Sequence, residues 1–318
     1  MSLLSLENVS TTYRSPTGAF RAIEDVSLTI AQGETVGLVG ESGCGKSTLG
    51  KTLMRLVPTS QGQIRLDDED ITHASGRALL PARRKLQMIF QDPFASLNPR
   101  HSIRRILTGP LKVHGVKGRA ERERIAQEIV LEVGLPADSL DRFPHEFSGG
   151  QRQRIGIARA LILQPQLIVC DEPVSALDLS IQAQIINLLV RLKREFGLSY
   201  LFISHDLSVV RYFADRVLVM YLGRIVESGP TQEVWDSPRH PYTRALIDAV
   251  PDASHSREGA APLSGDLPGV QNLPGGCRFH PRCPFATDLC RSVEPLIQPD
   301  ATGHAFACHH PLAVAEEA

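Results

Sequence analysis

The feature of the sequence that most constrains the fold is GESGCGKS, residues 40–47, which fits the pattern G-x-x-x-x-G-K-[ST]. It follows a short apolar segment expected to form a strand and precedes a segment expected to form a helix. The glycines would let the backbone curl so that successive N–H groups face a polyphosphate, and the helix start would add its own N–H groups and positive dipole end. This arrangement predicts nucleotide binding, whereas an ordinary glycine-rich turn would bind nothing.

The side chains after the glycines would complete this phosphate site. Lys46 would reach the β- and γ-phosphates, and the hydroxyl of Ser47 would hold Mg²⁺. The residues of this loop expected to contact the nucleotide are Gly40, Glu41, Ser42, Gly43, Cys44, Gly45, Lys46, Ser47 and Thr48.

A second motif, LIVCDEP at residues 167–173, contains the acidic side chains that nucleotide hydrolysis would need. Its apolar strand would deliver Asp171 to the edge of the sheet where open α/β sheets bind ligands. Asp171 would then hold Mg²⁺ through water, and Glu172 would orient or deprotonate the attacking water, a role worth roughly 10²–10⁴-fold in rate. Alone, the pair would be an ordinary surface Asp-Glu at a strand end.

Strand-like and helix-like segments alternate along the chain, which predicts an α/β fold with a parallel-rich sheet and helices on both faces. Leu49, Leu53 and Leu56 are expected on one side of the first helix. Ile181, Ile185, Leu188, Leu189 and Leu192 form the apolar face of a later one. Strands are expected over residues 3–13, 22–30, 34–40, 85–92, 166–173, 199–206 and 216–229, the last as a hairpin turning at Gly223-Arg224, and helices over 46–56, 98–131, 151–163 and 181–196.

Composition sets further bounds. The chain has 318 residues, 42% of them hydrophobic, and a formal net charge of −1, which suits about two ordinary domains. The near-neutral balance gives no support to nucleic acid as a partner. No apolar run approaches the roughly 18 residues that cross a bilayer, and the N-terminus lacks the layout of a secretory signal. A cytosolic protein is therefore expected.

The segment FSGGQRQRIGIARAL, residues 147–161, resembles the signature sequence of ATP-binding-cassette (ABC) ATPases, with Phe147 in place of the usual leading leucine. Other elements of that family occur in the expected order: Tyr13, the Q-loop Gln91, the D-loop SALD ending at Asp178, and the switch His205. The resemblance implies a P-loop NTPase core with an antiparallel β subdomain and a helical signature subdomain.

The resemblance also implies residue roles. Tyr13 would stack on adenine, His205 would contact the γ-phosphate, and Gln91 would join Mg²⁺ or the lytic water. Two chains would form a head-to-tail dimer, each ATP being covered by the partner's signature segment, whose residues lie before a helix and suit phosphate binding. The implied catalytic set is Glu172, His205 and Gln91; the Mg²⁺ set is Ser47, Gln91 and Asp171; the further nucleotide contacts are Ser148, Gly149, Gly150, Gln151 and Asp178.

Three stretches resemble a narrower branch, the ATPase subunits of dipeptide and oligopeptide importers: QDPFASLNPR (91–100), HPYT (240–243) and GCRFHPRCP (276–284). Residues 1–235 would be the nucleotide-binding domain, with its helical subdomain at about 98–163. Residues 236–318 would be a small, irregular C-terminal extension, with a linker at 251–274. The implied partners are a second ATPase, often a different chain, two membrane permease subunits, and indirectly an extracytoplasmic binding protein. The chain would work at the cytoplasmic face of the membrane, the region after Gln91 receiving a permease helix.

Four cysteines fall in the extension: Cys277, Cys283, Cys290 and Cys308. Their spacing matches neither the usual structural zinc pattern nor the ferredoxin patterns. Within the importer branch this set is associated with a [4Fe–4S] cluster; Zn²⁺ is the second expectation, and free or disulfide-bonded thiols the third. Arg278, Arg282 and Arg291 would offset a cluster's negative charge, and solvated roles are expected for His280, His304, His309 and His310. Cys44 and Cys170 are expected to be small, buried side chains.

Three alternative functions stay open at this point. A soluble ABC ATPase of DNA repair or translation usually carries two cassettes or a long coiled-coil insertion, which this chain lacks. An importer of another solute, such as a nickel chelate, glutathione or an oligosaccharide, would share the same motifs. In the third alternative the cysteine tail itself senses iron or redox state.

Overall fold

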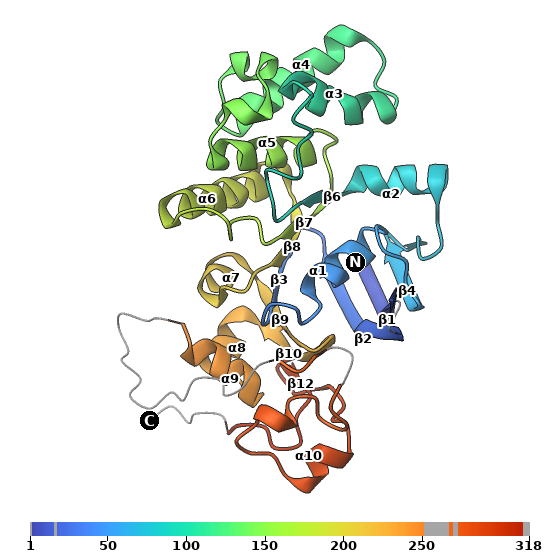
Figure 1. Cartoon of the computed structure of the whole chain (residues 1–318), viewed down its shortest axis with the longest axis vertical. Helices are drawn as coiled ribbons and strands as arrows, with labels where there is room; N and C mark the ends of the chain where they lie inside the picture. The colour runs from blue at the N-terminus through green and yellow to red at the C-terminus, as the bar shows by residue number, and fades with distance from the viewer. Residues whose placement is uncertain (1, 16–17, 251–266, 270–272, 314–318) are drawn as a thin grey trace. The chain divides into compact units, whose positions relative to one another are not determined.

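The structure is a computed structural model that describes residues 2–15, 18–250, 267–269 and 273–313 (Figure 1). Most of the linker expected at 251–274 lies outside these residues. The chain divides into two compact units. The first unit comprises residues 1–3, 30–34 and 66–201, and the second comprises residues 4–29, 35–65 and 202–318.

Within the described residues the strands form two sheets, of eight and of four strands. The larger has the order β11-β12-β10-β9-β3-β8-β7-β6 and the smaller β2-β1-β4-β5. The larger sheet is mixed, because β3 pairs with β9 and β6 with β7 in parallel, whereas β10 pairs antiparallel with both β9 and β12. The strands are β1 (Ser2–Ser15), β2 (Gly18–Ala31), β3 (Thr35–Val39), β4 (Gln61–Leu66), β5 (Glu69–Asp70), β6 (Leu86–Ile89), β7 (Leu167–Asp171), β8 (Ser199–Ile203), β9 (Arg216–Tyr221), β10 (Arg224–Pro230), β11 (Gln298–Pro299) and β12 (Ala305–Phe306).

The first unit carries the longest helices of the described residues. The stretch predicted as helical over 98–131 forms two helices, separated where Gly115 and Gly118 take positive φ. On the last helix Ile185, Leu189 and neighbouring leucines are buried as expected, while Ile181 is only half-buried. The helices are α2 (Leu80–Lys85), α3 (Ile103–Val113), α4 (Arg119–Glu132), α5 (Gly149–Leu161) and α6 (Leu179–Phe196), with 3₁₀ turns at Gly76–Leu79, Ala137–Asp141 and Pro144–Glu146.

In the second unit β3 is buried at all five positions, which fits a strand covered on both faces. The hairpin of β9 and β10 turns at Leu222 and Gly223, with φ of 43° and 82°, one residue earlier than the sequence predicts. Helix α1 (Lys46–Leu53) buries Leu49 and Leu53, but it ends before Leu56, which is 51% exposed, so the expectation that Leu56 lies on the same side of this helix is wrong.

The C-terminal extension contributes helices and, unexpectedly, strands. Its helices are α9 (Pro241–Asp248) and α10 (Asp288–Ser292), with a 3₁₀ turn at His280–Arg282, and α7 (Leu207–Phe213) and α8 (Thr231–Asp236) precede them. The two short strands β11 and β12 join the larger sheet, Glu227 of β10 pairing with Phe306 of β12. The rest of the described extension is irregular, as expected.

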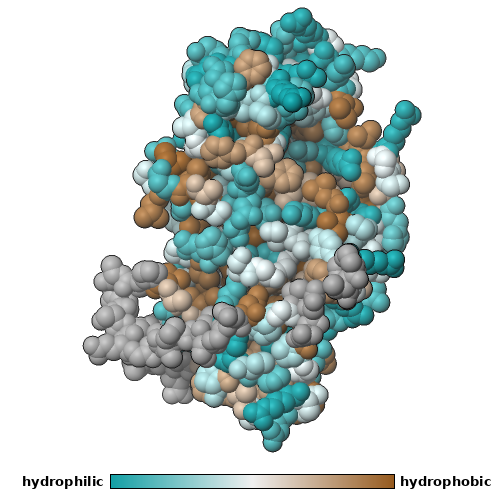
Figure 2. Space-filling model, viewed as in Figure 1, coloured by the Kyte–Doolittle hydropathy of each residue, from teal (hydrophilic) through white to brown (hydrophobic). Residues whose placement is uncertain are grey.

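No helix in the part of the chain that the structure describes is both long and apolar enough to cross a bilayer. On the face shown in Figure 2, hydrophobic residues lie in small areas interspersed with hydrophilic ones.

Candidate nucleotide-binding site

The glycine loop follows β3 and leads into α1, as the motif requires. Gly40 has a φ of 149°, and a Cβ there would lie 2.2 Å from the carbonyl oxygen of Met220. At Gly45, with a φ of 113°, a Cβ would lie 2.6 Å from the carbonyl oxygen of Ala22. Both positions therefore exclude any side chain, because backbone conformation and neighbouring backbone atoms each forbid one.

Lys46, the first residue of α1, is buried with 4% exposure. Its ammonium group curls back over the loop, where it donates hydrogen bonds to the carbonyl oxygens of Gly40 at 2.7 Å and Glu41 at 3.0 Å. A buried ammonium needs such partners, and phosphate oxygens would offer stronger ones. Cys44 is buried as expected, and burial raises the pKa of its thiol, which leaves it a small neutral side chain.

In the first unit the structure brings together two residues that the sequence places 81 positions apart. The side-chain amide of Gln91 donates a 3.0 Å hydrogen bond to Oε2 of Glu172. Glu172 follows directly after β7, which ends at the buried Asp171. Its φ of 47° lies in the left-handed region, a conformation that is strained for a residue with a side chain and is concentrated at functional sites.

The signature segment starts α5 with a reciprocal capping box. The Ser148 hydroxyl accepts from the backbone N–H of Gln151 at 3.4 Å, and the Gln151 side chain accepts from the backbone N–H of Ser148 at 3.0 Å. A Cβ at Gly150 would lie 2.7 Å from Cγ2 of Ile181 on α6. The segment is thus held by its own cap and by close packing on the next helix.

The other predicted site residues have separate local environments. Asp178 caps α6, accepting from Ser180 and from the backbone N–H of Ile181, and the latter hydrogen bond is the main reason that its pKa is lowered. His205 is exposed in the loop between β8 and α7. Tyr13 on β1 is half-buried, with its ring centroid 5.7 Å from that of Phe20.

Comparison with known proteins gives two family matches. Residues 23–175 match the ABC transporter model, and residues 226–290 match the model of the oligopeptide/dipeptide transporter C-terminal region. A putative peptide import ATP-binding protein of Brucella ovis is 49% identical over 96% of this chain and 97% of the relative. The oligopeptide transport ATP-binding protein AppF of Bacillus subtilis is 51% identical over 93% of this chain and 92% of its own length. This chain belongs to the ATP-binding subunits of ABC-type dipeptide and oligopeptide importers.

Solved structures agree with the family. The ATP-binding cassette MJ0796, described as a dimer in a post-hydrolysis state bound to ADP and Pi, superposes with a TM-score of 0.66 at 30% identity and covers 72% of this chain and 98% of its own. The cassette cbiO1 of Clostridium perfringens gives a TM-score of 0.64 at 28% identity, over 73% and 90% of the two chains. The predicted ABC ATPase fold is therefore confirmed, and the importer ATPase is an ATP-hydrolysing enzyme.

The four cysteines of the extension gather around one small pocket. Cys277, Cys283, Cys290 and Cys308 line it together with His280, His309 and His310. All six cysteines of the chain are free. Burial raises the pKa of Cys308 to about 11, and the neighbouring thiols add to the rise. The structure therefore places all four thiols at one pocket, while the group that they were predicted to bind stays a prediction.

A preformed metal site is not present in the described residues, where no group of three or more His, Cys, Asp or Glu side chains is placed to hold a metal ion. This finding bears equally on the predicted [4Fe–4S] cluster and on the zinc alternative, because neither has a preformed set of ligands among these residues. The four thiols do suit a larger thiolate-ligated group in their chemistry, since Cys₄ ligation is the usual donor set of iron–sulfur clusters.

One prediction for the surroundings of the cysteines is wrong, and two of the arginines expected to offset a cluster's charge are paired with carboxylates. His304 is not solvated: it is buried, and its Nε2 lies 2.6 Å from Oε1 of the equally buried Glu227 on β10. Arg278 is held by the Leu222 carbonyl oxygen and the Glu24 carboxylate, so its charge is already matched. Arg291 pairs with Asp288.

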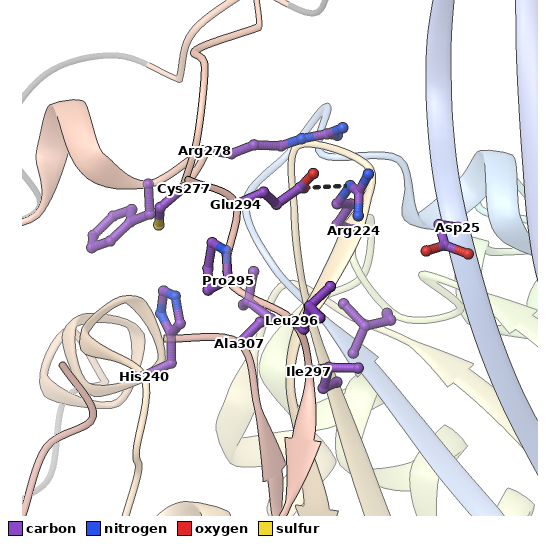
Figure 3. Close-up of a pocket in the computed structure, with 13 residues that line it drawn as sticks. Asp25, Arg224, His240, Cys277, Arg278, Glu294, Pro295, Leu296, Ile297 and Ala307 are labelled. Atoms are coloured by element: carbon purple, nitrogen blue, oxygen red, sulfur yellow. Dashed lines mark ion pairs between the residues drawn. The ribbon is translucent and has the colours of Figure 1, made fainter. Parts of the chain in front are cut away.

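A second, larger cavity of about 280 Å³ adjoins the cysteine pocket and shares Cys277 and His240 with it. Figure 3 shows Arg224 and Glu294 facing one another across a 2.9 Å ion pair at this cavity, with Leu296 and Ile297 below. Its arginines are thus neutralised by residues of the same chain.

Sequence reasoning missed two residues of the extension that contact the glycine loop, Tyr242 and Arg282. The Tyr242 hydroxyl accepts a 2.8 Å hydrogen bond from the backbone N–H of Glu41, and Arg282 forms an ion pair with the Glu41 carboxylate. The HPYT stretch was available as a signal, but it indicated only the family branch. Contacts between residues some 200 positions apart have no local sequence pattern.

Proposed function

We propose that this ABC ATPase hydrolyses ATP to drive uptake of dipeptides or oligopeptides through a membrane permease. The observation that carries the hydrolytic part is the hydrogen bond between Gln91 and the strained Glu172 at the end of β7. Support for the cargo comes from relatives, named as peptide-import and oligopeptide-transport proteins, that match nearly the whole chain including its extension.

The residues of the glycine loop would bind the triphosphate. Lys46 would leave the carbonyl oxygens of Gly40 and Glu41 for the β- and γ-phosphates, because charged acceptors form stronger hydrogen bonds. The Ser47 hydroxyl, Gln91 and, through water, Asp171 would hold Mg²⁺. When bound, Mg²⁺ would neutralise charge that develops on the phosphate oxygens. Tyr13 would stack on the adenine ring.

Glu172 would position the attacking water and take its proton. As the water oxygen bonds to the γ-phosphorus, the bond to the bridging oxygen of ADP breaks, giving ADP and phosphate. Gln91 would keep the carboxylate in place through its 3.0 Å hydrogen bond. His205 would contact the γ-phosphate.

A second ATPase subunit would complete the site with its own signature segment. The capped start of α5, Ser148 to Gln151, would present N–H groups to the γ-phosphate across the dimer, with Asp178 nearby. ATP would close the dimer, and hydrolysis would release it. Two membrane permease subunits and an extracytoplasmic binding protein would complete the importer, with this chain bound at the cytoplasmic face of the membrane.

The permease would contact the region after Gln91. Phe94 is 58% exposed, and the Arg152 guanidinium stacks 4.0 Å from its ring centroid. An exposed aromatic ring held by a cation is a typical anchor for a partner. In this proposal residues 1–235, with the helical subdomain at about 98–163, form the motor, and residues 236–318 the extension.

The cysteine pocket is proposed to hold a [4Fe–4S] cluster through Cys277, Cys283, Cys290 and Cys308. Support comes from the gathering of four thiols at one pocket. Anaerobically purified chain would then be brown, with absorbance near 400 nm that bleaches in air and four iron atoms per chain. A colourless, iron-free chain would refute the proposed cluster. Colour that persists after all four cysteines are changed to serine would refute it as well.

Uptake measurement tests the proposed function. Cells that lack the chromosomal copy and carry the wild-type chain should import labelled dipeptides and oligopeptides, while cells carrying Glu172→Gln should not. Purification of the tagged chain should recover permease subunits. Uptake of a nickel chelate, glutathione or an oligosaccharide in place of peptides would contradict the proposed cargo. Recovery of DNA-repair or ribosomal proteins in place of permease subunits would contradict the proposed transport function.

A further inference from the structure

Glu41, the second residue of the glycine loop, is held at two points by the C-terminal extension. Its backbone N–H donates to the Tyr242 hydroxyl at 2.8 Å. Its carboxylate accepts two hydrogen bonds from Arg282, from Nη1 at 2.6 Å and from Nη2 at 2.9 Å. A bidentate guanidinium–carboxylate pair of this kind fixes the orientation of the two side chains as well as the distance between them.

The Arg282 side chain is shielded from water, with only 5% of it exposed, while the Glu41 side chain is 26% exposed. The guanidinium lies 6.0 Å from the ring centroid of Tyr221. The hydrogen bonds to Glu41 raise the pKa of Arg282, so it stays charged. A pair in this setting is poorly screened, and removing one partner leaves the other as a shielded, unpaired charge.

The two contact residues rest on a rigid base. Tyr242 lies in the first turn of α9, and its ring packs against those of Tyr221 on β9 and Phe279 of the extension, with centroids 4.7 and 5.4 Å away. Arg282 ends the 3₁₀ turn that begins one residue after Phe279. Both side chains therefore reach the loop from a packed aromatic cluster.

The loop itself has little stiffness of its own, because three of its eight residues are glycines with positive φ. Lys46 now braces it through the carbonyl oxygens of Gly40 and Glu41. When Lys46 turns to the phosphates these two hydrogen bonds are lost. The hydrogen bonds from Tyr242 and Arg282 do not depend on Lys46, so they still hold Glu41 in place.

We propose that Arg282, aided by Tyr242, is a positioning residue for ATP binding, which holds the phosphate-binding loop through Glu41. The extension thereby completes the nucleotide site of the same chain. The pair preorganises the loop so that less ordering is lost when the triphosphate binds. Because the loop is shaped before hydrolysis begins, the effect falls on nucleotide affinity and not on the chemical step. This inference rests on ATP binding at the glycine loop and is independent of the cargo.

The test measures steady-state ATP hydrolysis by the full chain in its assembled transporter. Arg282→Ala should raise KM for ATP about tenfold, the effect expected for losing a hydrogen-bonded charge pair, with kcat changed less than twofold. Arg282→Lys should give an intermediate KM, since an ammonium makes one contact where the guanidinium makes two. Tyr242→Phe should raise KM by about two- to fivefold. Arg244→Ala, which removes an exposed arginine of the same extension that is paired with Asp248, is the matched control and should change neither constant.

A double-mutant cycle distinguishes two roles for Arg282: positioning the glycine loop through Glu41, or only holding the C-terminal extension against the rest of the chain. If Arg282 acts through Glu41, Arg282→Ala should add little to KM in a Glu41→Gln background. An Arg282 that only fastened the extension would lower the melting temperature and leave KM unchanged, which would overturn the proposal. If Arg282→Ala does not fold, unchanged KM values for Arg282→Lys and Tyr242→Phe would overturn it equally. A wild-type complex without ATPase activity would instead refute the proposed function.

Discussion

Protonation of His240 should make this protein lose stability as pH falls below neutrality. His240 is 1% exposed and caps α9, with its Nδ1 accepting a 3.0 Å hydrogen bond from the backbone N–H of Tyr242. That role requires an unprotonated Nδ1. Burial lowers the pKa of His240 to about 4, although the nearby Glu227 carboxylate acts in the opposite direction.

The size of the effect follows from linkage. In the unfolded chain the His240 side chain has a pKa of about 6.5, whereas in the folded chain its pKa is about 4. Between these values the unfolded state binds more protons, so stability falls as pH falls. The difference of about 2.5 pH units is worth about 3 kcal/mol, of which about 1 kcal/mol is lost by pH 5.5.

Denaturant unfolding of the full chain at pH 7.0, 5.5 and 4.5 would measure this loss. His240→Asn keeps an oxygen acceptor at the cap and cannot titrate, so its stability should decline less steeply with acid. His73→Asn changes an exposed histidine and should leave the pH dependence as it is in the wild type. Parallel curves for the wild type and His240→Asn across this range would refute the reasoning.

Two substitutions test the nucleotide site, and a pair of glycine substitutions tests the packing of the signature segment. Glu172→Gln should abolish phosphate release yet leave an ATP-bound closed dimer, visible by size-exclusion chromatography; retained hydrolysis would mean that another residue positions the water. Lys46→Ala should weaken ATP binding tenfold or more in a fluorescence titration, and unchanged affinity would contradict the phosphate-cradle role. Gly150→Ala places a Cβ 2.7 Å from Cγ2 of Ile181 and should cost about 1–3 kcal/mol in denaturant unfolding. At Gly149 the same change meets an atom only at 3.5 Å and should cost less; equal losses would disprove the packing argument.

The glycine loop, the Asp171-Glu172 pair and the signature segment could be read from the sequence because each is a contiguous pattern with a local cause. A backbone that must curl around phosphate needs glycine at fixed positions, and a helix start needs a cap such as Ser148. The alternation of apolar strands and amphipathic helices likewise fixed the fold class, since burial follows periodicity. The short strands β4, β5, β11 and β12 were missed because they lack such a pattern.

The sequence by itself therefore determined the α/β class and the nucleotide loop, whereas the shared pocket of the four cysteines is seen only in the structure. Only the tertiary structure shows that Gln91 donates a hydrogen bond to Glu172, that His304 is buried against Glu227, and that Arg282 forms an ion pair with Glu41. Local propensity acts over a few residues, whereas these pairs are brought together by packing across 77 to 241 positions of chain. An ion pair of that kind has no periodic signal, and only the packed elements set its distance.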